Sequence, residues 1–260
     1  MRPVIPLLAV ILGVAAAGAA RAEVQISAET VNAATGKASP MNMYIAADRL
    51  KMDTDKMAVI YRDDTGTIYT VMKERRQYIA LDPATMQRMA EMMAAMQDRM
   101  RQQMQSMPEG QRKQMEANGM PGAAPAKPDG PYQKTGQSKV VGGWSCQVFR
   151  KVLGSGATVD SCFAPVDAVG LTHADLATLK GLTERMRKAM PQMAQMNSMD
   201  LNAQTQEIGF EGFPVETVVS SDGRPRTTTV MKTVQHLSLP ADTFEVPAGY
   251  TRQEMPGPGR

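Results

Sequence analysis

Apolar and polar residues follow a two-residue period in short runs over the first part of the chain. The runs lie at residues 24–28, 41–45, 57–61, 67–72 and 78–81. Turn residues stand between them, most clearly in Asp63-Asp64-Thr65-Gly66. Short strands separated by turns at this spacing predict an antiparallel meander.

The period changes after residue 81 to that of a helix. Asp82-Pro83 supplies an N-cap acceptor followed by proline at the first helical position. Steps of three and four then place methionines on one helical face. These are Met86, Met89, Met93, Met96, Met100, Met104 and Met107. We expect a helical insertion at about 83–117, followed by a mobile linker rich in Gly, Pro and Ala at about 118–131.

Strands are expected again at 137–141, 144–153 and 157–164, before a second helical insertion at about 172–199. Thr172 and Asp175 have the spacing of a capping box at its start. Its apolar stripe consists of Leu176, Leu179, Leu182, Met186, Met190, Met193 and Met196. Beyond residue 199 the strand pattern returns, at 208–213, 215–220 and 227–239.

Helices inserted between antiparallel strands predict an α+β fold, because each helix must bury its apolar stripe against the sheet. We expect one domain over residues 23–260. Its sheet would be a curved, incomplete β-barrel with two Met-rich helices across it, and such an arrangement can enclose an apolar cavity.

The N-terminus resembles a secretory signal. Arg2 precedes an uncharged, apolar stretch, and Ala20-Arg21-Ala22 offers small residues at a cleavage site. We therefore predict a signal peptide at 1–22 and a periplasmic protein with no transmembrane segment after cleavage. Cleavage would remove two arginines, leaving 27 Lys and Arg against 26 Asp and Glu. That balance disfavours nucleic acid as a partner.

Both cysteines lie near a turn signal. Cys146 and Cys162 stand eight residues on either side of Gly154, in Gly154-Ser155-Gly156. Two strands joined at this turn would bring the cysteines nearly opposite each other, and an even cysteine count in an oxidising compartment indicates a disulfide. Such a bond would stabilise the fold by roughly 3 kcal/mol.

Several of these segments together resemble a known family. They are the tail Leu239-Pro240-Ala241-Asp242-Thr243-Phe244-Glu245-Val246-Pro247-Ala248-Gly249-Tyr250, the paired-cysteine hairpin, the segment 41–57 and the Met/Gln-rich insertion. They are similar to an uncharacterised family of exported bacterial proteins with a domain of unknown function. That family is distantly similar to the lipoprotein-carrier superfamily. The resemblance implies an incomplete antiparallel β-barrel covered by helices, and transfers no catalytic residues.

The methionines raise the main functional question, since 23 occur in the chain. One interpretation is a plain helix core in an envelope interaction or structural protein that has no small ligand. The leading hypothesis is a non-enzymatic binding or carrier protein for a lipid, an acyl chain or an amphipathic peptide, because flexible thioethers adapt to varied apolar shapes. The face expected to bind comprises Met86, Met89, Met93, Met96, Met100, Leu176, Leu179, Leu182, Met186 and Met190.

A third hypothesis is soft-metal binding, because thioethers favour Cu(I). Met86, Met89, Met93 and Met96 offer sulfurs along one helical face, and Met41 and Met43 offer a further pair. No other cofactor is expected. Catalysis is not expected either, because the chain lacks the G-x-S-x-G, H-E-x-x-H and G-x-G-x-x-G motifs.

Overall fold

The computed structural model describes residues 23–106, 129–189 and 201–253. The predicted signal peptide, most of the predicted linker and the end of the second predicted helix therefore lie outside the described residues. Among the described helices, none combines the length and the apolar character needed to cross a membrane.

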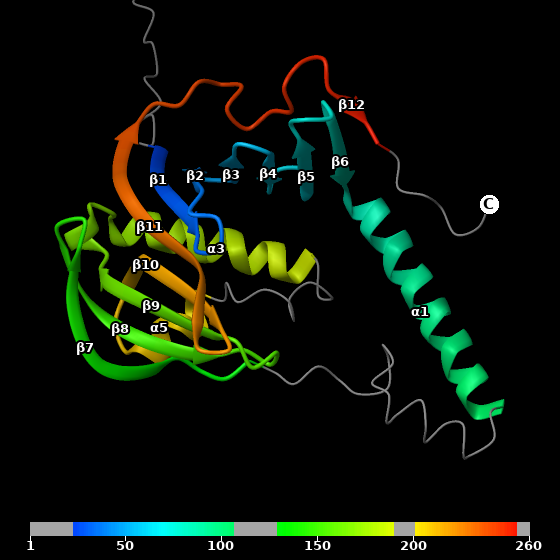
Figure 1. Ribbon diagram of the computed structural model, residues 1–260. Helices are drawn as coiled ribbons and strands as arrows, with labels where there is room; N and C mark the ends of the chain where they lie inside the picture. Colours follow the sequence, from blue (N-terminus) through cyan, green and yellow to red (C-terminus); the bar gives the residue numbers. More distant parts are fainter. Residues whose placement is uncertain (1–22, 107–128, 190–200, 254–260) are drawn as a thin grey trace, which may run out of the picture.

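The described strands form one open sheet of 12 strands in the order β12-β6-β5-β4-β3-β2-β1-β11-β10-β9-β8-β7. The strands are β1 (Glu23–Asn32), β2 (Ala38–Ala46), β3 (Arg49–Thr54), β4 (Met57–Arg62), β5 (Thr67–Met72), β6 (Gln77–Leu81), β7 (Gln133–Val141), β8 (Trp144–Val152), β9 (Thr158–Pro165), β10 (Gly212–Ser221), β11 (Arg224–Leu237) and β12 (Thr251–Arg252). The sheet curves without closing (Figure 1), so the α+β class and the curved antiparallel sheet are confirmed.

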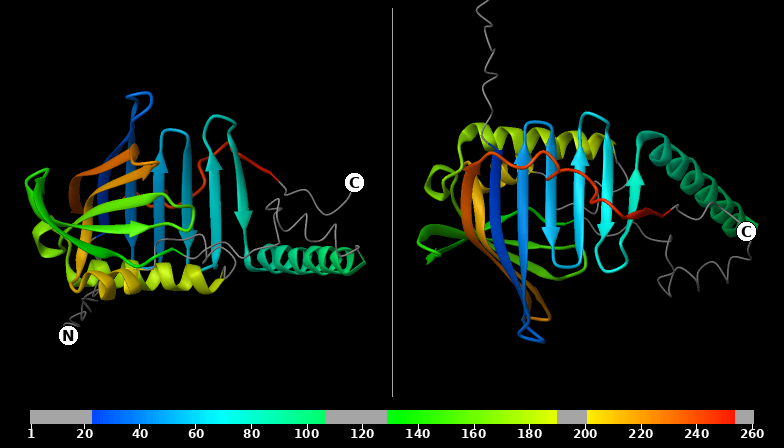
Figure 2. Two further views of the ribbon diagram at one scale, coloured as in Figure 1. Left: turned by 60° about the horizontal axis from the view of Figure 1, so that its bottom comes forward. Right: turned by 90° about the horizontal axis from the view of Figure 1, so that it is seen from above.

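Within the described ranges, three α-helices interrupt the strands: α1 (Pro83–Ser106), α3 (His173–Ala189) and α5 (Leu201–Ile208). The predicted N-caps are present. The Thr85 N–H donates to Asp82 over 2.7 Å, and Thr172 and Asp175 exchange the reciprocal bonds of a capping box. Figures 1 and 2 show α3 crossing one end of the strands, while α1 leads away from the sheet after β6.

Three details of the predicted elements were wrong. Residues 201–208 form a helix, where we expected the strand pattern to have returned, and Ile208 ends that helix rather than beginning a strand. Gly209 follows with a φ of +80°, a conformation that glycine adopts without steric cost. Strand β3 was missed although its short sequence, RLKMDT, alternates polar and apolar residues. Strand β10 continues through Pro214 at a register shift, so the two strands expected there are one.

Opposite faces of the β2–β6 region pack against different parts of the chain. On one face, α3 and the strands form the main core, which includes Leu176, Leu179 and Leu182. On the other face, Phe244 from the C-terminal segment packs with Ile60 and Val71. The tail then adds β12 in parallel to β6, where the Thr251 N–H donates to the Arg76 carbonyl over 2.9 Å. The tail segment is thus a structural cover for the sheet.

Candidate functional site

Helix α3 covers a single row of residues across the sheet. Cross-strand pairing aligns Val24 with Ile45, Ile45 with Leu50, Leu50 with Tyr61, and Tyr61 with Ile68. We call these five residues the covered row. All are buried, and they share one core with the leucines of α3. This row is therefore part of the packed core.

Polar contacts fasten α3 over the covered row. Towards the C-terminal end of α3, the Arg185 Nε lies 2.8 Å from an Asp63 oxygen, and the Tyr61 hydroxyl donates to the same carboxylate over 2.7 Å. Burial and the contact with Asp63 raise the pKa of the Tyr61 hydroxyl, so that group stays protonated. The buried row and the helix above it are therefore linked through one carboxylate.

Both histidines of the chain contribute to the N-terminal attachment of α3. The His236 Nε2 on β11 lies 2.8 Å from Asp175. Burial would raise the pKa of Asp175, but hydrogen bonds from His236 and Thr172 lower it. His173 Nδ1 lies 2.6 Å from Glu211, and this hydrogen bond, followed by the charge of Asp167, raises the pKa of His173. These contacts give both histidines a structural role.

The same face of the sheet becomes more exposed away from α3, and there methionine predominates. Two-residue steps along the strands lead from the covered row to Met41 and Met43 on β2, Met52 on β3, Met57 on β4 and Met72 on β5. We call these five residues the methionine patch. Met43 lies directly opposite Met52, and Met57 lies opposite Met72. Met57 is 43% exposed and the other four are half-buried.

The described residues of the predicted apolar face lie in different surroundings. Leu176, Leu179 and Leu182 are buried in the core beneath α3. On α1, Met86 and Met89 are half-buried and Met96 is 65% exposed. The side chains of Met93, Met100 and Met186, and the whole of Met190, lie outside the described residues. Because α1 leads away from the sheet (Figure 2), the described methionines of α1 and the leucines of α3 are separated.

Sequence reasoning missed the methionine patch as a surface. It singled out Met41 and Met43 only as a pair, since the other members are up to 31 positions further along the chain. The available signal was weak, because β2 carries two alternating methionines and β3, β4 and β5 carry one methionine each. Only the register shows that these positions are neighbours.

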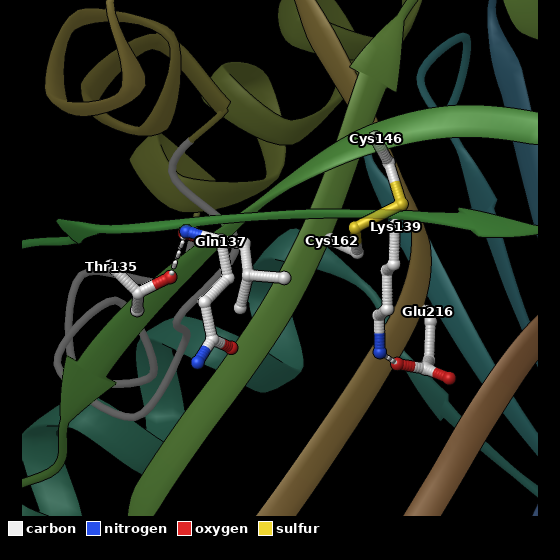
Figure 3. Close-up of a disulfide and its surroundings, with 7 residues drawn as sticks. Thr135, Gln137, Lys139, Cys146, Cys162 and Glu216 are labelled. Atoms are coloured by element: carbon white, nitrogen blue, oxygen red, sulfur yellow. Dashed lines mark hydrogen bonds and ion pairs between the residues drawn. A yellow bond between two sulfur atoms is a disulfide. The ribbon is translucent and has the colours of Figure 1, made fainter.

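The predicted disulfide is confirmed. Cys146 on β8 and Cys162 on β9 are joined, with Cα atoms 5.4 Å apart. The pairing is diagonal rather than directly opposite, because Cys162 faces Val148 in the register. Lys139 on β7 and Glu216 on β10 form an ion pair across the disulfide, so side chains from four adjacent strands meet there (Figure 3).

A groove of about 700 Å³ lies beside the disulfide, over β7 to β10. Its charged side chains are already engaged with one another. Arg150 binds Asp160 through two hydrogen bonds of 2.6 and 2.7 Å, and Lys139 pairs with Glu216. The groove is therefore lined by both polar and apolar groups, and its charged side chains have ion-pair partners within it or next to it.

Comparison with known proteins places the sequence in a family without an assigned activity. The family model described as "Domain of unknown function (DUF4412)" matches residues 84–250. A search of curated proteins finds no match. The match begins after the strands that hold the methionine patch, so it bears on the helices, the disulfide region and the tail.

Solved structures show a distant likeness. PNGF-II in its P21 crystal form has a TM-score of 0.38 at 6% identity, covering 89% of this chain and 31% of that one. MucB has a TM-score of 0.36 at 9% identity, covering 88% and 58%. The MucA/MucB complex of Pseudomonas aeruginosa gives 0.37 at 10% identity, covering 88% and 56%. The chain thus spans less than two thirds of each of these proteins.

Proposed function

The chain belongs to the DUF4412 family of unknown function, and we propose that it is a non-enzymatic binding protein whose methionine patch takes an acyl chain. The observation that carries this proposal is the contrast within one face of the sheet. The covered row is buried by α3, whereas the adjoining methionine patch is apolar and partly open. An open apolar surface continuous with a core is typical of a binding surface.

The chemistry of the patch favours an apolar ligand without fixed shape. Methionine is unbranched and has a polarisable thioether, so its side chain adjusts to the shape of what it contacts. The patch runs from β2 to β5, which are consecutive strands. At about 4.8 Å per strand spacing, it is about 14 Å wide. A narrow apolar band of this kind fits an extended hydrocarbon chain.

A fluorescent fatty acid tests the proposal directly. The full chain after signal cleavage is titrated with the probe, and we expect saturable binding. Met57→Glu places a charge in the patch at a position that is 43% exposed, so the fold should tolerate it. We expect at least a tenfold loss of probe affinity, because a carboxylate would have to be desolvated against the hydrocarbon chain.

The matched control is Met96→Glu on α1, where the native side chain is 65% exposed. We expect this variant to bind the probe like the native chain, and unfolding curves of both variants should confirm that they are folded. Loss of binding in Met96→Glu but not in Met57→Glu would place the ligand on the helix. Absence of saturable binding by the native chain, together with no lipid in mass spectra of the gently purified protein, would reject the function.

A further inference from the structure

We infer that Met41, Met43 and Met52 form a thioether site for Cu(I). The inference goes beyond acyl-chain binding and does not depend on it, since it uses the sulfur atoms of the patch rather than its apolar area. The sequence-based hypothesis placed a soft metal mainly on the helical residues Met86, Met89, Met93 and Met96 and offered Met41 and Met43 as a further pair; the register now adds Met52 to that pair.

The register brings these three residues together. Met43 and Met52 are directly opposed on β2 and β3, a relation that places Cβ atoms about 5 Å apart. Met41 lies two residues before Met43 on the same strand, or about 6.6 Å away along it. Met41 is also the diagonal neighbour of Met52, because it pairs with Thr54. Three flexible side chains thus start from adjacent points of one face.

Met43 packs against the main core, but methionine at three neighbouring strand positions is not the choice that strand packing favours. Strands favour β-branched and aromatic side chains, and the covered row follows that preference with Val24, Ile45, Tyr61 and Ile68. Methionine is used in a core to fill irregular gaps. Met41, Met43 and Met52 are only half-buried, so they are accessible to an ion from solvent.

The donor set selects a soft, singly charged ion. Thioethers are neutral and polarisable ligands that suit Cu(I), whereas carboxylates and imidazoles suit harder ions. Within the described ranges, no group of three or more His, Cys, Asp and Glu is placed to hold a metal. The nearest carboxylate in the sequence, Asp53, is on the opposite face of β3 and pairs with Lys51 and Lys73.

Substitution of methionine by leucine removes the sulfur atom but keeps an apolar side chain of similar size. We would compare the native chain with Met41→Leu/Met43→Leu/Met52→Leu and with the control Met86→Leu/Met89→Leu/Met96→Leu on α1. Each is titrated with Cu(I), kept reduced by ascorbate under nitrogen, against a coloured chelator. Ag(I) serves as a redox-inert probe of the same sites. We expect one tightly bound ion in the native chain and in the α1 variant, and at least a hundredfold weaker binding in the sheet variant.

X-ray absorption of the Cu(I)-loaded native chain should show sulfur as the scattering neighbour. Equal binding by all three proteins, or loss of binding in the α1 variant alone, would overturn the assignment. Fatty-acid binding by the same sheet variant provides the separation from the proposed function, because leucine keeps the apolar surface. If the sheet variant loses Cu(I) binding but keeps fatty-acid binding, the thioether sulfurs bind the metal independently of the apolar surface. That result would support the metal site whether or not the native chain binds an acyl chain.

Discussion

The two ends of one sheet face share a backbone geometry but differ in side chains. Under α3, the covered row uses branched and aromatic residues, and all of them are buried. Further along β2 to β5 on the same face, methionine becomes the commonest side chain and burial becomes partial. Branched and aromatic side chains are rigid and pack well against a fixed partner, which here is α3. Methionine is flexible and can adapt to partners of different shape. The difference separates a buried packing surface from a partly open one within a single face of the sheet.

The largest effect should come from matched truncations on β3. Leu50 is 7% exposed in the covered row, and Met52 is its half-buried neighbour on the same face. We expect Leu50→Ala to lower the free energy of unfolding by about 2–5 kcal/mol, the usual range for a buried leucine. Met52→Ala should cost clearly less in urea unfolding. Equal losses would mean that both ends of the face are core.

Removal of the disulfide tests whether ligand binding by the methionine patch depends on the stability of strands β7 to β10. The bond closes a 16-residue separation on β8 and β9. Cys146→Ala/Cys162→Ala should lower stability by about 3 kcal/mol in the chain-entropy model. Because neither cysteine belongs to the methionine patch, fatty-acid affinity of the folded variant should be unchanged. A change in affinity would show that the two halves of the sheet are coupled.

The attachment of α3 can be weakened through one carboxylate. Asp63→Ala removes the partner of both Arg185 and the buried Tyr61 hydroxyl. We expect a loss of about 1–3 kcal/mol, the cost of leaving a buried polar group without a hydrogen bond. Hydrogen exchange should become faster in α3 than in β7 to β10. Asp64→Ala is the control, since Asp64 pairs with Arg62 outside this contact, and it should leave α3 exchange unchanged.

The smallest expected effect is a pH dependence of the stability that the contacts at the N-terminal end of α3 provide. The pKa of His173 is raised, so its contribution is complete below the ordinary histidine value of about 6.5 and is lost as the pH rises through the raised pKa. The pKa values of Asp175 and Glu211 are lowered, so their contributions are present above about pH 4 and are lost as the pH falls through the lowered values.

Thermal unfolding measured from pH 2 to 9 should therefore show a maximum on the acid side of neutrality. His173→Asn should flatten the decline towards alkaline pH, and it should also weaken the acid limb, because the hydrogen bond with His173 helps to lower the pKa of Glu211. An unchanged alkaline limb in this variant would exclude His173 as its cause.

The sequence predicted local features well because their causes are local. The N-cap at Asp82, the capping box at Thr172 and the disulfide across the Gly154 turn each depend on residues close in the chain. The methionine patch could not be predicted in this way. Its members become neighbours through the register of four strands, and strand β3, which carries Met52, was not recognised as a strand.

The methionine stripes of the helices show a second limit of prediction from sequence. Helical spacing shows which residues share a face, but not what that face meets. For α3 the answer is the covered row, through Leu176, Leu179 and Leu182. Helix α1 instead leads away from the sheet, and the side chain of Met96 on it is exposed. The same periodicity thus describes two different environments.

The C-terminal tail also determines when the sheet can be completed during synthesis. Phe244 covers Ile60 and Val71, which leave the ribosome more than 170 residues earlier. Strand β1 likewise cannot pair with β11 until that later strand has been synthesised. The nascent chain therefore carries an uncovered apolar surface through most of its translation, a state prone to association with other chains. A chain truncated before Phe244 should consequently aggregate during production, even though it retains every strand of the methionine patch.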